Sequence, residues 1–398
     1  MTPRATACTA LVATAAITCV GGSTSSLEAA AAPALTLHGP GELARGLAVL
    51  LTGSGAAPGA EVDLRLASTT TAVTLARTHA APTGQFRFTY RPRRERAAYQ
   101  LRVVSRGSSS RAVIVRSRDV VLRAFGDANF GDGVANVMAQ RGVIWPWRSV
   151  APLLRTADIS FGNLECSISR RGSRVPKAFN FRGSPSALRT VVHFAGLDVL
   201  NLANNHVGDY GTAALLDTVR SVRAAGAVPI GAGANIAQAR RPQVIRRLGL
   251  RIAFVGFVDI GPTSFAAGSH KPGSVFASPS VIRADVRAAR RQADVVIASF
   301  HWGIERHTQP TARQRDFARI ALSAGATAVI AAHPHVLQPV VRPSAHRLIA
   351  YSLGNFVWSA GSALTSRTGI LEVRLSARGV ESARLRHAHI IGTRPRLG

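Results

Sequence analysis

The sequence predicts two folded parts: a small all-β sandwich over residues 33–118 and an α/β domain over residues 119–392, with residues 393–398 as a tail. Short segments of alternating hydrophobicity fill residues 34–117, whereas longer apolar runs alternate with amphipathic segments from about residue 119. Alternation with period two predicts strands, and strands that alternate with helices predict a largely parallel sheet. The chain has 398 residues, 46% of them hydrophobic, which is enough for two domains.

The first part consists of segments typical of short strands. They are separated by turn-forming stretches such as GPG, SGAAPGA and APTG. The expected strands are ALTL (34–37), LAVLLTG (47–53), EVDLRL (61–66), TAVTLAR (71–77), QFRFTY (85–90), YQLRVVS (99–105) and RAVIVRS (111–117). Their even spacing predicts an immunoglobulin-like sandwich, although the cysteine pair and tryptophan of antibody domains are absent. We expect a spacer or attachment role, since no catalytic cluster occurs here.

The second part alternates buried strands with amphipathic helices. Five of the expected strands are LDVLNLA (197–203), RIAFVGF (251–257), ADVVIASF (293–300), ATAVIAA (326–332) and RLIAYSL (347–353). Three helices are expected over 211–226, 278–292 and 310–325. Asp209 lies near the start of the first helix, Gly226 suits its C′ position, and Pro310 suits the first turn of the third.

The charge of the chain is strongly basic. There are 49 basic against 20 acidic residues, for a formal net charge of +29, and Lys177 and Lys271 are the only lysines. No aromatic residues are interleaved with the arginines and no groove-binding motif is present, so we expect no nucleic-acid partner. Attraction to an anionic cell-envelope polymer fits the charge better.

Residues 1–32 resemble a secretory signal peptide. Arg4 precedes a short apolar run, and small residues around Ala31 offer a cleavage site. We therefore expect an exported protein, either extracellular or associated with the cell surface. A lipid anchor at Cys19 stays open as an alternative, although AITC lacks the usual leucine. Cys166 is the single cysteine after residue 32, and a small buried apolar role is expected for it.

Polar side chains follow five predicted strands of the α/β domain, two of which, VVLRAF (120–125) and ADISF (157–161), precede those named above. The carboxyl ends of parallel strands meet at one edge of a sheet, where ligand sites form. The residues at these ends are Asp127, Asn129, Asn163, Glu165, Asn204, Asn205, His206, His301, His333 and His335. Together they supply carboxylate, carboxamide and imidazole groups without a thiolate.

This set of groups predicts a site for two divalent metal ions. Imidazoles and carboxylates suit Mn, Fe or Zn, and the absence of thiolates argues against a closed structural zinc. A bridging carboxylate can hold two such ions about 3.5–4 Å apart, where they activate water and bind a phosphoryl oxygen. Each residue alone is more often a turn former or a core group, so the prediction depends on all five strand ends.

The same stretches resemble the signature blocks of the CapA-type poly-γ-glutamate capsule synthesis proteins. The blocks are GDANF, GNLE, LANNHVGDYG, VPIGAGANIAQARRP, FHWGIE, AAHPHVLQPV and YSLGNFVW, within residues 120–392. That family resembles the calcineurin-like metallophosphatases. The resemblance implies a four-layer α-β-β-α metallophosphatase-like sandwich with a dinuclear pocket at the strand ends.

The resemblance also implies a role for each residue. Asp127, Asn129 and His335 would bind one metal ion and Asn205, His301 and His333 the other, with Glu165 bridging them. His206 would be the general acid that protonates the leaving oxygen. Asn163 could replace or assist Glu165. The residues expected to border the pocket, as substrate contacts or supports of the ligands, are Asn163, Asn204, Glu305 and Asn355.

The chain departs from the metallophosphatase pattern at Asn129. That position normally holds the histidine of Asp-x-His, and an asparagine is a weaker ligand. This difference puts tight occupancy of the first metal position in doubt.

Two functions follow from these expectations. The first is a metal-dependent hydrolase that acts on a phosphoester or an anionic envelope polymer such as poly-γ-glutamate. The alternative is a non-catalytic polymer-binding or assembly subunit of a capsule synthesis or export system, with the proteins of that system as partners.

Overall fold

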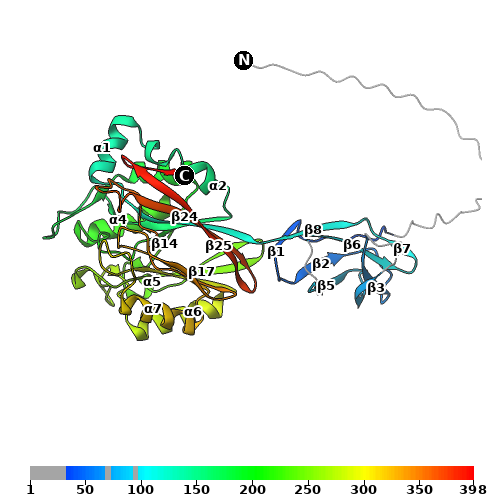
Figure 1. The fold of residues 1–398 in the computed structure, drawn as a ribbon. Coiled ribbons are helices and arrows are strands. Elements are labelled where there is room, and N and C mark those ends of the chain that lie inside the picture. Colours follow the sequence, from blue (N-terminus) through cyan, green and yellow to red (C-terminus); the bar gives the residue numbers. More distant parts are fainter. Residues whose placement is uncertain (1–32, 68–72, 93–96) are drawn as a thin grey trace, which may run out of the picture.

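The computed structural model describes residues 33–67, 73–92 and 97–398 (Figure 1). The predicted signal peptide over residues 1–32 and the alternative lipid anchor at Cys19 lie outside the described residues. No helix within the described part is long and apolar enough to cross a membrane.

The first part is all-β, as predicted. Its strands are β1 (Glu42–Ala44), β2 (Val49–Gly53), β3 (Glu61–Leu66), β4 (Thr74–His79), β5 (Phe86–Tyr90), β6 (Ala98–Ser105), β7 (Ser108–Ser109) and β8 (Val113–Arg118). One sheet has the order β1-β8-β6-β3-β4, with β7 paired to β6, and β2 pairs with β5 in a second. The predicted strand 34–37 is wrong, because only His38 beyond it forms an isolated bridge, to Thr52.

The second part contains two larger sheets (Figure 1). The first has the order β14-β13-β10-β9-β24-β25-β26, and β23 also pairs with β9. Its strands are β9 (Val120–Ala128), β10 (Ile159–Leu164), β13 (Val199–Asn201), β14 (Val228–Ile230), β23 (Asn355–Val357), β24 (Arg367–Ser376), β25 (Gly379–Ile391) and β26 (Arg394–Leu397). β26 lies in the segment predicted as a tail, where it pairs with β25.

The second sheet has the order β16-β17-β19-β20-β22-β21. Its strands are β16 (Gln243–Arg247), β17 (Leu250–Val258), β19 (Val295–His301), β20 (Ala328–Ala332), β21 (Val340–Ser344) and β22 (Arg347–Ala350). The central strands β17, β19, β20 and β22 are parallel, and β19 is buried at every position. Such continuous burial explains why these strands read as unbroken apolar runs.

The helices and short elements connect these strands. They are α1 (Asp132–Arg141), η1 (Trp145–Trp147), α2 (Ala151–Arg155), α3 (Pro185–Ala195), α4 (Gly211–Ala224), α5 (Ile236–Ala239), η2 (Thr263–Phe265), α6 (Pro279–Gln292), α7 (Ala312–Ala324), β11 (Ser167–Ile168), β12 (Arg182–Gly183), β15 (Ala232–Gly233) and β18 (Gly273–Ser274). β11 pairs with β12 and β15 with β18, in two-stranded sheets.

Three apolar clusters form the core of the second part. One joins residues of both larger sheets, such as Phe161 of β10 and Phe254 of β17. A second joins the first sheet to α1–α4, and a third joins the second sheet to α6 and α7. The central strands of each sheet are therefore covered on both faces, and the polar residues predicted to form the site lie at or just beyond strand ends.

The helix ends differ in detail from the predictions. α7 begins with a capping box of Thr311 and Gln314, so Pro310 precedes the N-cap instead of occupying the first turn. α4 begins at Gly211, and its N-cap Tyr210 makes no side-chain capping bond. Asp209 accepts hydrogen bonds from other parts of the chain instead. Gly226 has a φ of 90° after the end of α4, as its predicted C′ role requires.

Side chains at the end of β8 connect the two parts. The Arg118 guanidinium donates hydrogen bonds of 2.7 and 2.9 Å to the Asp158 carboxylate, which also accepts one from the Val121 N–H. The Ala44 N–H donates to the Leu248 carbonyl at 2.9 Å. Burial alone would raise the pKa of Asp158, but the hydrogen bonds from Arg118 and Val121 hold it below its usual value of 3.8.

Replacing Asp158 by Asn tests this junction. At neutral pH we expect the free energy of unfolding to fall by about 1–2 kcal/mol, because two charge-assisted hydrogen bonds are weakened. The folded pKa lies below the unfolded pKa, so the wild-type advantage is complete above the unfolded value and is lost as pH falls through the folded one. Urea unfolding of both proteins from pH 7 to pH 3 measures this difference in the free energy of unfolding. Asp316→Asn, which breaks an exposed pair with Arg319, is the control and should change little.

Candidate functional site

The polar strand ends predicted from the sequence meet at one place. Asp127 lies near the end of β9, Asn163 near the end of β10 and His301 at the end of β19. His333 and His335 follow β20, and Asn355 begins β23. The site therefore draws on both larger sheets.

Two carboxylates lie at its centre. Asp127 and Glu165 are both fully buried, and their oxygens lie within 4.8 Å of one another and of a His335 ring nitrogen. Burial and the neighbouring Asp127 charge raise the pKa of Glu165 well above its usual range. Burial alone would raise the pKa of Asp127 too, but the hydrogen bond from His335 and the charge of His301 lower it. The two carboxylates thus offer more hydrogen-bond acceptors than the neighbouring groups have hydrogens to donate.

The Asn163 side chain orients these groups. Its Nδ2 donates to Asp127 Oδ1 at 2.8 Å and lies 3.2 Å from His301 Nδ1 and 3.4 Å from Glu165 Oε2. Three acceptors thus share two N–H hydrogens. Its Oδ1 accepts from Asn201 at 3.0 Å and from Asn204 at 3.2 Å, which fixes the direction of the amide.

Three imidazoles surround the carboxylates. His301 Nε2 lies 2.8 Å from Asn205 Oδ1 and 3.3 Å from Glu165 Oε1. His335 Nδ1 donates to Asn355 Oδ1 at 2.9 Å, which leaves its Nε2 facing Glu165 Oε1 at 4.0 Å. The His333 N–H donates to Asp127 Oδ2 at 3.2 Å. Hydrogen bonds to the side chains of Asn205 and Asn355 thus hold the His301 and His335 rings, whereas the contact of His333 is made by its backbone.

Burial decides the protonation of these rings in the absence of metal. Burial and the neighbouring His335 lower the pKa of His333 to about 3, and burial and His333 lower that of His301 well below its usual range. Burial opposes charging of His335 as well, but the hydrogen bond to Asp127 raises its pKa. Neutral imidazole is the form that binds a metal ion.

The backbone at the histidine pair is strained. His333 has a φ of 101° and His335 a φ of 57°, both in the left-handed region that side chains rarely occupy. Each costs about 1–3 kcal/mol and persists only where surrounding contacts enforce it. Pro334 between them restricts its own φ, and the two rings lie 5.7 Å apart. This turn directs both rings toward the carboxylates.

The residues fit a divalent metal centre. Glu165 Oε1 and His333 Nδ1 are buried and have no hydrogen-bond partner among the described residues. Such orphaned atoms are costly unless something binds them. Three ligand groups converge here: Glu165, His301 and His333; Asp127, Glu165 and His335; and Glu305, His333 and His335. Glu165 and the histidine pair belong to more than one group, as a shared site for two ions would require.

His206 faces this cluster from the side. Its Nδ1 lies 2.7 Å from Asp209 Oδ2, and its Nε2 points toward Glu165 Oε1 at 3.9 Å. Lys177 lies 2.6 Å from Asp209 Oδ1 and donates to the Asn205 carbonyl. Burial lowers the pKa of His206, while Asp209 acts in the opposite direction. The Asp209 carboxylate thus holds the ring with Nε2 toward the metal ligands.

Sequence reasoning missed Lys177, Asp209 and Asn201 as parts of the site. Lys177 is one of only two lysines beside 47 arginines, which was an available signal. Asp209 was assigned to a helix start, whereas it binds Lys177, His206 and the Phe181 N–H. Asn201 ends a buried strand and gave no signal.

Asn129, a predicted ligand, and Glu305, predicted to border the pocket, lie in different surroundings. Asn129 Oδ1 accepts a hydrogen bond from the Gly131 N–H at 2.7 Å, so its oxygen is already engaged. Glu305 is exposed but reaches within 4.8 Å of the His333 and His335 nitrogens. Cys166 is fully buried and free, as expected, and burial raises the pKa of its thiol.

A cavity of about 440 Å³ opens onto the site. Its lining includes His206, His335, Glu305, Asn355, Phe181 and Trp358. The Phe181 ring stacks on His206 with centroids 4.3 Å apart, and Trp358 lies 4.9 Å from the His335 ring. Aromatic walls thus flank the acid candidate and one metal-ligand candidate.

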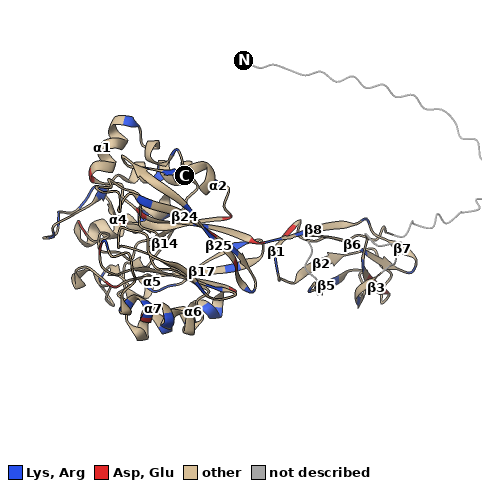
Figure 2. Ribbon diagram, in the orientation of Figure 1, with Lys and Arg blue, Asp and Glu red and all other residues tan. Residues whose placement is uncertain are grey.

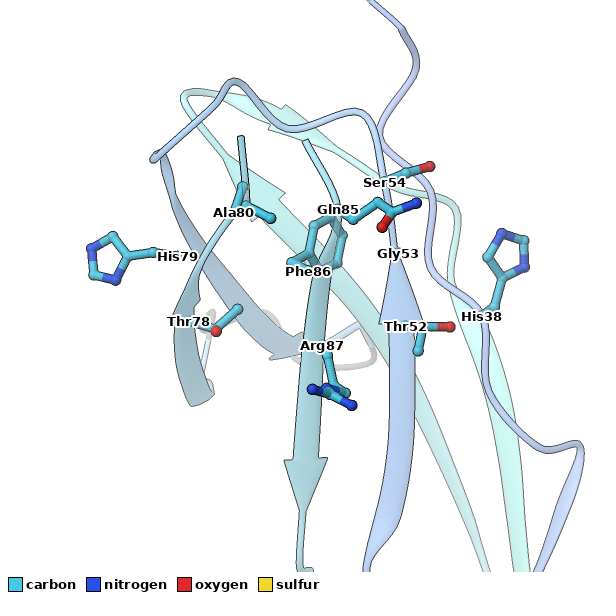
Figure 3. A pocket seen from close by; sticks show the side chains of 11 residues that line it. His38, Thr52, Gly53, Ser54, Thr78, His79, Ala80, Gln85, Phe86 and Arg87 are labelled. Atoms are coloured by element: carbon cyan, nitrogen blue, oxygen red, sulfur yellow. The ribbon is translucent and has the colours of Figure 1, made fainter. Parts of the chain in front are cut away.

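The β-sandwich part holds a separate hollow of about 750 Å³ (Figure 3). Figure 3 shows that His38 and His79, which line it, point away from each other. Among the described residues, no carboxylate lines this hollow.

Close backbone packing positions Asp127, and Gly126→Ala tests it. A Cβ at residue 126 would lie 1.8 Å from the Gly354 carbonyl oxygen. We expect the free energy of unfolding to fall by about 2–3 kcal/mol or more, as overpacking does. Urea unfolding measures it, with Gly361→Ala as control, where a Cβ meets nothing within 4 Å. Equal stability of the two variants would contradict this packing.

Comparison with known proteins identifies the family. The family described as bacterial capsule synthesis protein PGA_cap matches residues 121–360. The chain is 32% identical over 267 residues to the PGA biosynthesis protein CapA of Bacillus subtilis, covering 66% of this chain and 70% of that protein. It is 31% identical to the capsule biosynthesis protein CapA of Bacillus anthracis, covering 64% of this chain and 63% of that one.

Solved structures show a more distant likeness. The NAD nucleotidase NadN of Haemophilus influenzae has a TM-score of 0.44 at 11% identity, covering 68% of this chain and 56% of that one. TT1561 of Thermus thermophilus has a TM-score of 0.36 at 12% identity, covering 67% and 98%. The sequence matches, which include every predicted site residue, carry the assignment: the chain belongs to the bacterial capsule synthesis protein (PGA_cap) family.

Proposed function

We propose that this chain is a metal-dependent hydrolase of the cell envelope, acting on an anionic polymer such as poly-γ-glutamate or on a phosphoester. One observation carries the proposal. Glu165 Oε1 and His333 Nδ1 are buried without a hydrogen-bond partner in the described chain, inside overlapping groups of metal-type ligands. Two divalent ions, Mn, Fe or Zn, would satisfy both atoms.

The proposed assignment of ligands follows the contacts. Asp127 and His335 would hold one ion and His301, His333 and Asn205 the other, with Glu165 between them. The Asn129 oxygen is engaged by Gly131, which favours a weaker role for it at the first ion. When bound, the ions would supply an activated water and charge stabilisation for the transition state.

His206 is the proposed proton donor to the leaving group. Asp209 binds Nδ1, so Nε2 is the nitrogen that faces the ligand cluster and the adjoining cavity. The stacked Phe181 ring fixes the plane of the imidazole. Asn163 and Asn204 would keep the carboxylates and the His206 loop in place, since Asn204 Oδ1 accepts from the His206 N–H at 3.0 Å.

The arrangement of layers supports this proposal. The three core clusters favour a four-layer α-β-β-α sandwich of metallophosphatase type, with helices outside two central sheets. The all-β first part is proposed as an immunoglobulin-like attachment domain. The signal-like residues 1–32 support export to the cell surface.

The names of the relatives support an envelope role. The Bacillus proteins are named for PGA and capsule biosynthesis, and the Mycobacterium tuberculosis relative for a probable accessory role in polyglutamine synthesis. The net charge of +29 also favours a second candidate, a polymer-binding or assembly subunit without hydrolytic activity, working with capsule synthesis or export proteins. Figure 2 shows basic residues on both parts of the chain, which suits contact with a polyanion.

Metal analysis combined with a hydrolysis assay tests the proposal. We expect purified protein to contain up to two divalent ions per chain and to cleave a small phosphodiester or poly-γ-glutamate. The double variant His333→Ala/His335→Ala should lose most of the metal. His206→Gln should keep the metal but lose about 10²–10⁴-fold in kcat, the usual contribution of a general acid.

A matched control separates this effect from misfolding. His193→Gln changes an exposed histidine on α3 outside the site and should keep both metal and activity. Metal-free wild type would contradict the metal centre. Metal-bound protein without hydrolysis of either substrate, combined with polymer binding, would favour the assembly subunit.

A further inference from the structure

A second cavity is lined by some of the same chain segments as the cavity that opens onto the candidate metal ligands. It has a volume of about 570 Å³, and its lining includes Arg367, His387, His389, Thr308 and Gln309. Two segments of the chain contribute side chains to both cavities. Residues 305 and 306 line the first and 308 and 309 the second, while the segment 359–368 contributes to both.

Hydrogen bonds tie both segments to the residues after the histidine pair. Asn355 Nδ2 donates to the Thr365 carbonyl at 3.1 Å, and the same side chain accepts from His335 Nδ1. In the other segment, Gln338 Nε2 donates to the His307 carbonyl at 2.8 Å. The second cavity is therefore held in a fixed position relative to the candidate metal ligands.

The second cavity is lined for an anion. In the described part of the chain no aspartate or glutamate lines it, whereas one guanidinium and two imidazoles do. His387 and His389 lie on the same exposed face of β25, two residues apart, beside Arg367 of β24. Arg367, and Arg306 in the first cavity, form no ion pair with any carboxylate in the described residues. A carboxylate ligand would supply that missing partner.

We propose that the second cavity extends the substrate site and binds the part of a carboxylate-bearing polymer that runs away from the metal centre. This inference rests on the proposed function. Each bound carboxylate would contact Arg367 or a histidine, while Thr308 and Gln309 offer hydrogen bonds to backbone amides. Among the described residues, no Phe, Tyr or Trp lines the cavity, and these are the side chains on which single-stranded nucleic acid most often stacks.

The test compares two arginine variants for binding to fluorescently labelled poly-γ-glutamate. Arg367→Gln removes a charge inside the cavity, and Arg384→Gln removes one from an exposed position on the same β-hairpin outside both cavities. We expect Arg367→Gln to weaken polymer binding about tenfold, as loss of one charge-assisted contact does, and to lower its salt dependence. Arg384→Gln should change the affinity less than about twofold.

Chain length supplies the second measurement. We expect the γ-glutamyl-glutamate dimer to occupy the first cavity alone, so Arg367→Gln should not change its binding. A combined His387→Gln/His389→Gln variant should weaken polymer binding in the same direction. Equal losses in Arg367→Gln and Arg384→Gln, or equal losses for dimer and polymer, would overturn the proposal. So would single-stranded DNA of matched charge that binds as tightly and depends on Arg367.

This result is independent of the hydrolysis assay. If the metal centre is absent but Arg367 is required for polymer binding, the proposed hydrolysis fails and the cavity stands as a polymer site. If metal and hydrolysis of a small phosphodiester are intact in Arg367→Gln, and polymer binding is unchanged, the cavity assignment fails and the hydrolase stands.

Discussion

Two carboxylates buried side by side are the constraint on which the site depends. Asp127 and Glu165 are inaccessible to water and repel one another, so neither could stay ionised without nearby cationic or donor groups. The Asn163 amide shares two hydrogens among three acceptors and cannot satisfy them all. The turn that holds His333 and His335, the hydrogen bonds of Asn163 and the ends of the parallel strands all bring imidazole or N–H groups to these two carboxylates.

Much of this arrangement could be predicted from the sequence, because parallel strands bring their carboxyl ends to one edge. Asp127, Glu165, His301, His333 and His335 each follow a long apolar run, and the structure places all five together. The β-rich first part was also predictable from its alternation. The strand predicted at 34–37 is absent, because four residues of apolar alternation do not show whether a partner strand lies beside them.

Other features depend on contacts that no local pattern encodes. The left-handed φ of His333 and His335 follows from packing around the turn, and Pro334 alone does not specify it. Asp209 was predicted to lie at a helix start, but its carboxylate accepts a hydrogen bond from Lys177, which lies 32 positions earlier in the chain. Residues 393–398 were predicted as a tail, but β26 within them is an edge strand because it pairs with β25. The last six residues alone do not show that pairing.

Lys177 has one consequence for how the protein can be handled. Its amine lies against Asp209 and is largely shielded, while Lys271, the only other lysine, is exposed. Of the two lysines, acylating reagents will therefore react mainly at Lys271. A protein this cationic is usually expected to be labelled at many positions, yet this one can be attached to a surface in one or two orientations with its site left chemically intact.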